Sequence, residues 1–135
     1  LLALVMLIYG FAPSWSILAL PFIAALALMT ALAVGTLLAS VSVIYRDFRY
    51  VVPFMVQIWM FLTPVVYPAT LVPEAWRWLI YLNPMTGIIE GFRSAFLDRP
   101  FDVHGLVIST VGTAAILGMG LAVFGRFERR FADRI

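Results

Sequence analysis

The sequence predicts an all-α integral membrane protein: a helical bundle of about three complete transmembrane helices plus part of one more, with two short re-entrant or interfacial helices before the last span. The chain of 135 residues is 64% hydrophobic and only 12% charged, and its mean hydropathy is +1.04, outside the range of soluble domains. Residues 17–44 contain no charge at all. As a helix, this run would be about 42 Å long and exceed the roughly 30 Å hydrocarbon core of a bilayer.

Residues 1–9 are expected to be the end of a partial first span, because this apolar stretch is too short to cross a membrane and Gly10 and Pro13 follow it. The stretch lacks the basic segment and the cleavage site of a signal peptide. We therefore expect the sequence to begin part-way through a membrane helix, as the C-terminal part of a longer protein. Residues 17–44 are the first complete span.

The second span is predicted at 51–66, where Pro64 and Pro68 end an apolar helix. Two short helices follow within 73–97. Each is too short to cross and half apolar, so we interpret this region as a re-entrant or interfacial hairpin, which is tolerated at membrane depth where protein or a wet cavity surrounds it.

Local signals place the two helices of the hairpin. Pro73 and Glu74 begin the first, and Asn83 and Pro84 provide an N-cap and a first-turn proline for the second. In the second helix, one face is apolar and consists of Met85, Ile88, Ile89, Phe92 and Phe96. The opposite face carries Glu90, Arg93 and Ser94.

The last span is predicted at 105–124 and a tail at 125–135. Six arginines flank the spans on one predicted side, namely Arg46, Arg49, Arg126, Arg129, Arg130 and Arg134. The other side carries three arginines diluted by four acidic residues. The positive-inside rule therefore predicts a multi-pass membrane protein with a cytoplasmic 45–50 loop and C-terminus, and with the hairpin facing out.

Small residues recur every four positions along both long spans. One ridge is Ala27, Ala31, Gly35 and Ala39, and the other is Ala114, Gly118 and Ala122. Such ridges allow helices to approach closely in a membrane. We expect them to pack within the subunit, with a dimer interface as the alternative.

Composition excludes several classes of chemistry. The chain has no Cys and one His, and all nine basic residues are Arg. Without Lys, it cannot bind ATP through a P-loop, and the placement of its Arg residues argues against nucleic acid. The acidic and imidazole groups of Asp98, Asp102 and His104 could form a metal or acid–base cluster. They are also ordinary residues for a loop that leads into a span, so we predict no catalytic, cofactor or metal site in this chain.

Aromatic and paired charged residues gather toward the outer half. An aromatic belt at the membrane interface accounts for most of the aromatic side chains, and stacking on sugar rings is the alternative. The pair Glu90 and Arg93 either lines a wet pathway or lies among lipid headgroups. The candidate residues for a translocation path or outer gate are Trp59, Tyr67, Trp76, Trp78, Tyr81, Glu90, Phe92 and Arg93.

The order of the short motifs resembles one family. Along the chain stand Tyr45-Arg46-Asp47, then Thr63-Pro64-Val65-Val66-Tyr67-Pro68, then Pro73-Glu74-Ala75-Trp76-Arg77, then Asn83-Pro84-Met85, then Ile89-Glu90-Gly91-Phe92-Arg93. In this order the sequence is similar to the membrane subunit of bacterial ABC-type polysaccharide exporters, within the type-2 ABC exporter permeases.

The resemblance implies six spans per subunit, a homodimer and two cytoplasmic ATPase subunits, which bind the ATP and Mg²⁺. This chain would supply the end of the third span and the last three spans. The main ATPase-docking element of the family would precede it. Secondary contacts with the ATPase would then come from Tyr45, Arg46, Asp47, Arg49, Arg126, Arg129 and Arg130, although a solvated boundary also explains these charges.

The resemblance thus predicts a permease subunit for lipid-linked polysaccharide such as O-antigen, capsule or teichoic acid, with the glycan and membrane lipids as further partners. Export of lipids or drugs is an alternative in the same class. A membrane enzyme acting on lipid-linked sugars is an alternative of another class, and a passive scaffold would leave the hairpin unexplained.

Overall fold

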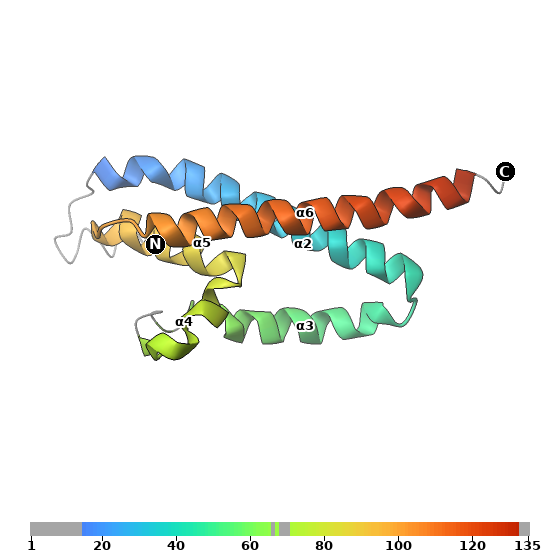
Figure 1. The fold of residues 1–135 in the computed structure, drawn as a ribbon, viewed down its shortest axis with the longest axis horizontal. Helices are drawn as coiled ribbons and strands as arrows, with labels where there is room; N and C mark the ends of the chain where they lie inside the picture. The colour runs from blue at the N-terminus through green and yellow to red at the C-terminus, as the bar shows by residue number, and fades with distance from the viewer. Residues whose placement is uncertain (1–14, 66, 68–70, 133–135) are drawn as a thin grey trace.

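A computed structural model describes residues 15–65, 67 and 71–132. The elements are η1 (Trp15–Ala19), α2 (Leu20–Ile44), α3 (Phe48–Leu62), α4 (Glu74–Tyr81), α5 (Pro84–Leu97) and α6 (Val103–Ala132) (Figure 1). Every regular element of this part is helical, so the prediction of an all-α protein is confirmed. The predicted partial span 1–9, Val66 at the end of the second predicted span and the last three residues of the tail lie outside the described residues.

Two helical stretches, Trp15–Ile44 and Val103–Gly125, are long and apolar enough to cross a membrane by length and composition. The helix α3 has 15 residues, which corresponds to about 22 Å, less than the roughly 30 Å hydrocarbon core. It begins at Phe48 and ends at Leu62, several residues earlier at both ends than the predicted span 51–66. It ends there because Thr63 precedes Pro64 and is extended, with φ −84° and ψ 129°.

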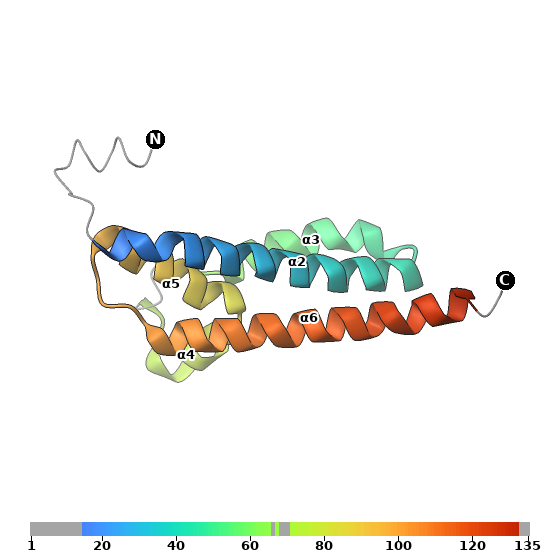
Figure 2. The same cartoon turned by 90° about the horizontal axis from the view of Figure 1, so that it is seen from above.

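The last helix is longer than the predicted span 105–124. It begins at Val103 and continues to Ala132, through most of the segment predicted as a tail. No proline interrupts this stretch, so nothing in its covalent structure ends the helix after Phe124. Figures 1 and 2 show α6 extending past the 45–47 turn between α2 and α3. The basic segments at 46–49 and 126–130 therefore lie toward the same end of the molecule.

The helices α2, α5 and α6 form one packed unit, with the half-length α5 beside both long helices (Figure 2). Pro84, the first residue of α5, lies against Gly112 in the middle of α6, where a Cβ atom would contact it at 3.4 Å. At the other end, Ser94 near the end of α5 bonds to Pro100, just before α6 begins. Thus α5 starts at mid-height in the bundle and runs to the end where α2 begins.

The core combines a small apolar cluster with buried hydroxyl groups. Ile23 and Leu26 of α2 pack on Ile88 and Ala95 of α5. Further along, Thr30 and Thr113 share a hydrogen bond of 2.7 Å, and Ser40 donates to the Gly120 carbonyl at 3.4 Å. Hydroxyl bonds of this kind hold helices together where lipid offers no competing partner.

The buried face of α5 differs from the predicted apolar face. Most residues on the buried face are small: Pro84, Thr86, Gly87, Ile88, Gly91, Ser94 and Ala95. Of the predicted face only Ile88 is buried; Met85, Ile89, Phe92 and Phe96 are half-buried. Ser94, assigned to the polar face, is also buried. The physical reason is close approach: Gly87 lies against the Gly105 carbonyl, where a side chain has no room.

Within the described residues, the small-residue ridges do not form the contact between α2 and α6, so their packing within the whole subunit stays a prediction. Ala31, Gly35 and Ala39 are exposed, as are Ala114, Gly118 and Ala122, and only Ala27 is half-buried. The contact between α2 and α6 instead uses a neighbouring register, in which Thr30 bonds to Thr113 and Ser40 bonds to Gly120. Small apolar residues permit close packing on any face of a helix, whereas hydrogen bonds of hydroxyl groups fix which faces of α2 and α6 are in contact.

Candidate functional site

Asn83 connects the end of α3 to the beginning of α5. Its Oδ1 accepts hydrogen bonds from the Met85 backbone N–H at 3.0 Å and from Trp59 Nε1 at 3.2 Å. Its Nδ2 donates to Thr63 Oγ1 at 2.9 Å. The predicted N-cap is confirmed. The same amide thus satisfies polar groups of three segments.

Arg93 holds the segment that follows α3 against α5. Its Nη1 donates to Glu90 Oε1 at 2.6 Å. Its Nη2 donates to three backbone carbonyls: Pro64 at 2.8 Å, Val65 at 2.9 Å and Tyr67 at 3.2 Å. These carbonyls follow the proline-interrupted end of α3 and have no helical partner, so the guanidinium group takes the place of the missing backbone donors.

Tyr81, at the end of α4, is bonded to the loop before α6. Its hydroxyl donates to Asp102 Oδ2 at 2.6 Å, and Asp102 Oδ1 accepts from the Gly105 backbone N–H at 3.0 Å. Burial, together with the neighbouring Asp102, raises the pKa of Tyr81 to about 12. Burial opposes ionisation of Asp102, but the bonds from Tyr81 and Gly105 and the charge of His104 outweigh it and hold the pKa of Asp102 below its usual range.

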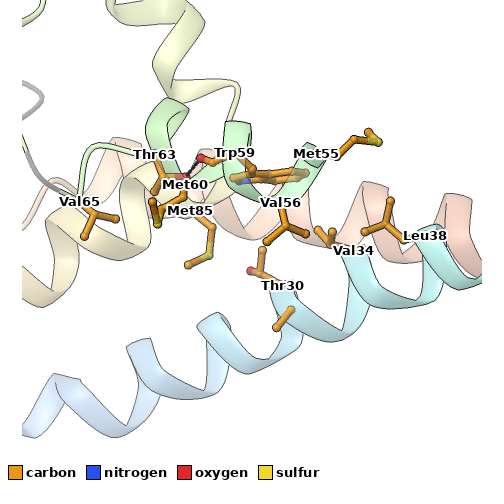
Figure 3. A pocket seen from close by; sticks show the side chains of 11 residues that line it. Thr30, Val34, Leu38, Met55, Val56, Trp59, Met60, Thr63, Val65 and Met85 are labelled. Atoms are coloured by element: carbon orange, nitrogen blue, oxygen red, sulfur yellow. Dashed lines mark hydrogen bonds between the residues drawn. The ribbon is translucent and has the colours of Figure 1, made fainter. Parts of the chain in front are cut away.

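An apolar groove of about 340 Å³ separates α3 from α2. Figure 3 shows Val56 and Trp59 of α3 on one side and Thr30, Val34 and Leu38 of α2 on the other. Its lining contains no charged residue: Thr30, Ala31, Val34, Leu38, Met55, Val56, Trp59, Met60, Thr63, Val65 and Met85. A second apolar pocket of about 550 Å³ shares Met55 and Trp59 and extends toward α4. Trp59 is thus the residue common to both hollows and to the Asn83 junction.

The residues proposed for a path or outer gate fall into different environments. Tyr81, Glu90 and Arg93 lie together at the α4–α5 end, whereas Trp76 and Trp78 are each 61% exposed on α4. Phe92 packs on the apolar core instead. Tyr67 lies in the segment held by Arg93, and its hydroxyl donates to the Phe61 carbonyl at 3.4 Å.

The residues proposed for ATPase contact lie at the opposite end. Tyr45, Arg46, Asp47 and Arg49 are exposed around the turn between α2 and α3. Arg126, Arg129 and Arg130 lie on the last turns of α6. The two sets are thus separated from the hairpin by the length of the bundle (Figure 1).

Asp98, Asp102 and His104, which were considered for catalysis, do not form one cluster, although the charge of His104 acts on Asp102. Asp98 accepts a hydrogen bond from Ser16 at 2.8 Å, and Asp102 is bonded to Tyr81. Within residues 15–65, 67 and 71–132, no group of three or more His, Cys, Asp or Glu side chains could hold a metal ion.

Two features of the site were missed from the sequence. Asn83 was expected only to cap a helix, and its bridge to Trp59 and Thr63 depends on the return of the chain after α4. The hydroxyl contact between Thr30 and Thr113 was also missed. The available signal was the three- and four-residue spacing of hydroxyl and small residues along both long helices, which competed with the ridges of Ala and Gly.

Two helices that are long and apolar enough to cross a membrane, with a half-length helix packed beside both, are compatible with an integral membrane protein. The chain belongs to the ABC-2 type transporter family, whose model matches residues 1–97. It is 28% identical over 130 residues to the O-antigen export system permease protein RfbA of Myxococcus xanthus, covering 94% of this chain and 50% of that protein.

Two proteins of the same name from Klebsiella pneumoniae are 25% and 24% identical, each over 127 residues. Each match covers 93% of this chain and 49% of the relative. The chain therefore spans about half the length of the curated relatives it matches.

Proposed function

We propose that this chain is part of the permease subunit of an ATP-driven exporter of lipid-linked polysaccharide, such as O-antigen, capsule or teichoic acid. The observation that carries the proposal is the similarity, along 93–94% of the chain, to proteins named as O-antigen export permeases. ATP and Mg²⁺ bind to a separate ATPase subunit, and the permease works as a dimer in the bacterial cytoplasmic membrane.

The α4–α5 hairpin forms the outer gate in this proposal. Two features support this role. The helix α5 begins at mid-height in the bundle, and Arg93 and Asn83, on α5 and just before it, bond to the segment that precedes α4. A polar headgroup cannot cross roughly 30 Å of hydrocarbon unaided at a useful rate, so the exporter must provide a wet path. Closure of the ATPases then rocks the subunits and opens that path beneath the hairpin.

The opposite end is cytoplasmic in this proposal. Both basic segments lie there, as the positive-inside rule requires of short loops next to spans. The exposed side chains of Tyr45, Arg46, Asp47 and Arg49 contact the ATPase, together with the last turns of α6. The exposed small-residue ridges receive helices from the rest of the permease or from its second copy.

Surface display of polysaccharide tests the proposal. The full-length gene is returned to cells that lack it, and surface glycan is measured by immunoblot. The variant with Trp76, Trp78, Glu90 and Arg93 all replaced should abolish display while remaining in the membrane. Unchanged display would remove the hairpin from the translocation path. Failure of the wild-type gene to restore any display would overturn the export function.

A further inference from the structure

A polar pocket of about 290 Å³ lies between α4, α5 and the segment that leads into α6. Its lining residues are Arg77, Tyr81, Glu90, Ser94, Arg99, Pro100 and Asp102. It differs from the two apolar hollows around Trp59, because every lining residue except Pro100 has a polar or charged group in its side chain. The helices α4 and α5 that line it lie toward the end of the bundle opposite both basic segments (Figure 1).

The pocket has a fixed frame. Tyr81 Oη donates to Asp102 at 2.6 Å, which joins α4 to the base of α6. On the facing wall, Ser94 Oγ donates to the Pro100 carbonyl at 3.2 Å and the Arg99 N–H donates to the Ser94 carbonyl at 3.1 Å. These bonds tie three segments together around the hollow, so its shape does not depend on one flexible side chain.

The charged groups of the lining converge on the Tyr81 hydroxyl. Asp102 bonds to it directly, and the charges of Glu90 and Arg77 both act on it. Arg99 borders the same pocket from the exposed loop. The pocket therefore offers both hydrogen-bond donors and acceptors beside an aromatic ring.

The charge balance of the lining favours a neutral ligand over an anion. Two guanidinium groups and two carboxylates line the pocket, so their formal charges cancel. A phosphate needs a surplus of donors and would be repelled by the two carboxylates. The hydroxyl groups of a sugar donate and accept at once, and one face of a pyranose ring is apolar enough to pack on an aromatic side chain. The volume lies at the small end of ligand pockets, which suits one saccharide unit.

We infer that the pocket formed by Arg77, Tyr81, Glu90, Ser94, Arg99 and Asp102 is a saccharide-binding subsite at the outer end of the permease, which holds one neutral sugar unit of the glycan. The inference rests on the proposed export function and adds a sugar-contacting site to it. The site lies within one subunit, and the hairpin that forms the outer gate provides α4 and α5 as two of its walls.

The test is sugar binding to the full-length permease in lipid nanodiscs, assembled without glycosidic detergent. D-mannose, D-galactose and N-acetyl-D-glucosamine are titrated separately and followed by saturation-transfer NMR. At least one should receive saturation. Arg99→Gln should weaken its apparent dissociation constant about tenfold, because a charged donor is lost from an exposed loop without a change in the fold. Tyr81→Phe should weaken it also. Tyr50→Phe removes the same hydroxyl group from a tyrosine that is 71% exposed and outside the pocket, and should leave the dissociation constant unchanged.

Three results would overturn the inference: no transfer to any of the three sugars, equal dissociation constants in all variants, or displacement of the sugar by inorganic phosphate at equal concentration. The ATPase subunit is assayed on the same preparation. A permease that assembles with the ATPase but binds no sugar would lose the subsite and keep the export function. A permease without an ATPase partner would lose the export function, whatever its sugar binding.

Discussion

The unit of α2, α5 and α6 and the helix α3 are both apolar, yet they are packed in opposite ways. The first is held by small residues and by hydrogen bonds between hydroxyl and carbonyl groups, and it contains the buried core. The helix α3 has no buried residue and is separated from α2 by an apolar groove. Within a membrane, hydrophobicity alone does not bring helices together, so close fit and polar bonds decide which faces pack.

The largest expected effect comes from filling the closest contact of the packed unit. A Cβ atom at Gly87 would collide with the Gly105 carbonyl and with Ser109 Oγ. Gly87→Leu should therefore separate α5 from α6 and remove the assembled protein from the membrane fraction, measured by gel filtration of a fluorescent fusion. Gly125→Ala, where a Cβ atom meets no neighbour, is the control. A normal elution profile for Gly87→Leu would show that α5 does not pack on α6 in this way.

Replacing one isoleucine in the packed unit and one in α3 compares how tightly the two regions are packed. Ile88 is fully buried, whereas Ile58 on α3 is 59% exposed. Ile88→Ala should lower the free energy of unfolding by about 2–5 kcal/mol, since it leaves a cavity in the core. Ile58→Ala should cost less than about 1 kcal/mol, because little is packed against it. Unfolding of the full-length protein in mixed micelles measures both. Equal losses would mean that α3 is as tightly packed in the whole protein as α5.

Arg93 links the two regions. Arg93→Gln removes the hydrogen bonds to the carbonyls of Pro64, Val65 and Tyr67. It also removes the ion pair between the guanidinium group and Glu90. We expect a loss of about 1.5–3 kcal/mol, the usual range for a hydrogen bond to a charged group. The segment after α3 should also become sensitive to protease.

The matched control for Arg93 is Arg77→Gln. Arg77 pairs with Glu74 at 3.8 Å, where the carboxylate side chain is 90% exposed, and its Nε donates to one backbone carbonyl, that of Val72, at 3.3 Å. A surface pair of this geometry contributes less than about 1 kcal/mol. If both variants lost the same stability, the contacts of Arg93 with the segment after α3 would have no structural role.

The smallest effect is expected at Tyr81 and depends on pH. The pKa of Tyr81 is raised to about 12, so the folded protein holds this proton more tightly than the unfolded chain. The stabilisation is complete below about pH 10 and is lost as the pH rises through about 12. The pKa of Asp102 is lowered, so its contribution is present above about pH 4 and is lost on acidification.

Tyr81→Phe should therefore lower the free energy of unfolding by about 1 kcal/mol near neutral pH. The difference in the free energy of unfolding between this variant and wild type should shrink above pH 10. Thermal unfolding of both proteins between pH 5 and pH 11 would measure it. Tyr50→Phe, at a residue 71% exposed, is the control. A difference that stayed constant across this range would contradict the Tyr81–Asp102 bond.

The sequence predicts the local features of this fold well and the packing poorly. Asn83 and Pro84 specify the start of α5 through bonds within a few residues, so the N-cap could be predicted. The faces of α2, α5 and α6 depend on partners distant in the sequence. For α5 the apolar periodicity predicted the wrong face, because the contact with α6 requires small residues at Gly87 and Gly91.

For the candidate site too, the sequence predicted some of the residues and not others. The sequence grouped Tyr81, Glu90 and Arg93 as candidate residues of one gate, and all three lie near one another around α4 and α5. Their place at the outer side of the membrane stays a prediction. The contribution of Arg99 to the same pocket could not be predicted, because it requires the fold of the loop after α5.

The central claim is that this chain is part of a permease driven by a separate ATPase. Purification of the full-length protein under mild detergent conditions tests it most directly, with the copurifying subunits identified and their ATPase rate measured. The account predicts an ATPase subunit in equal amount, whose rate responds to lipid-linked glycan. A permease that purifies alone, without a nucleotide-binding partner, would contradict it, and a rate that responds only to lipids without a glycan would point to the lipid-exporting alternative.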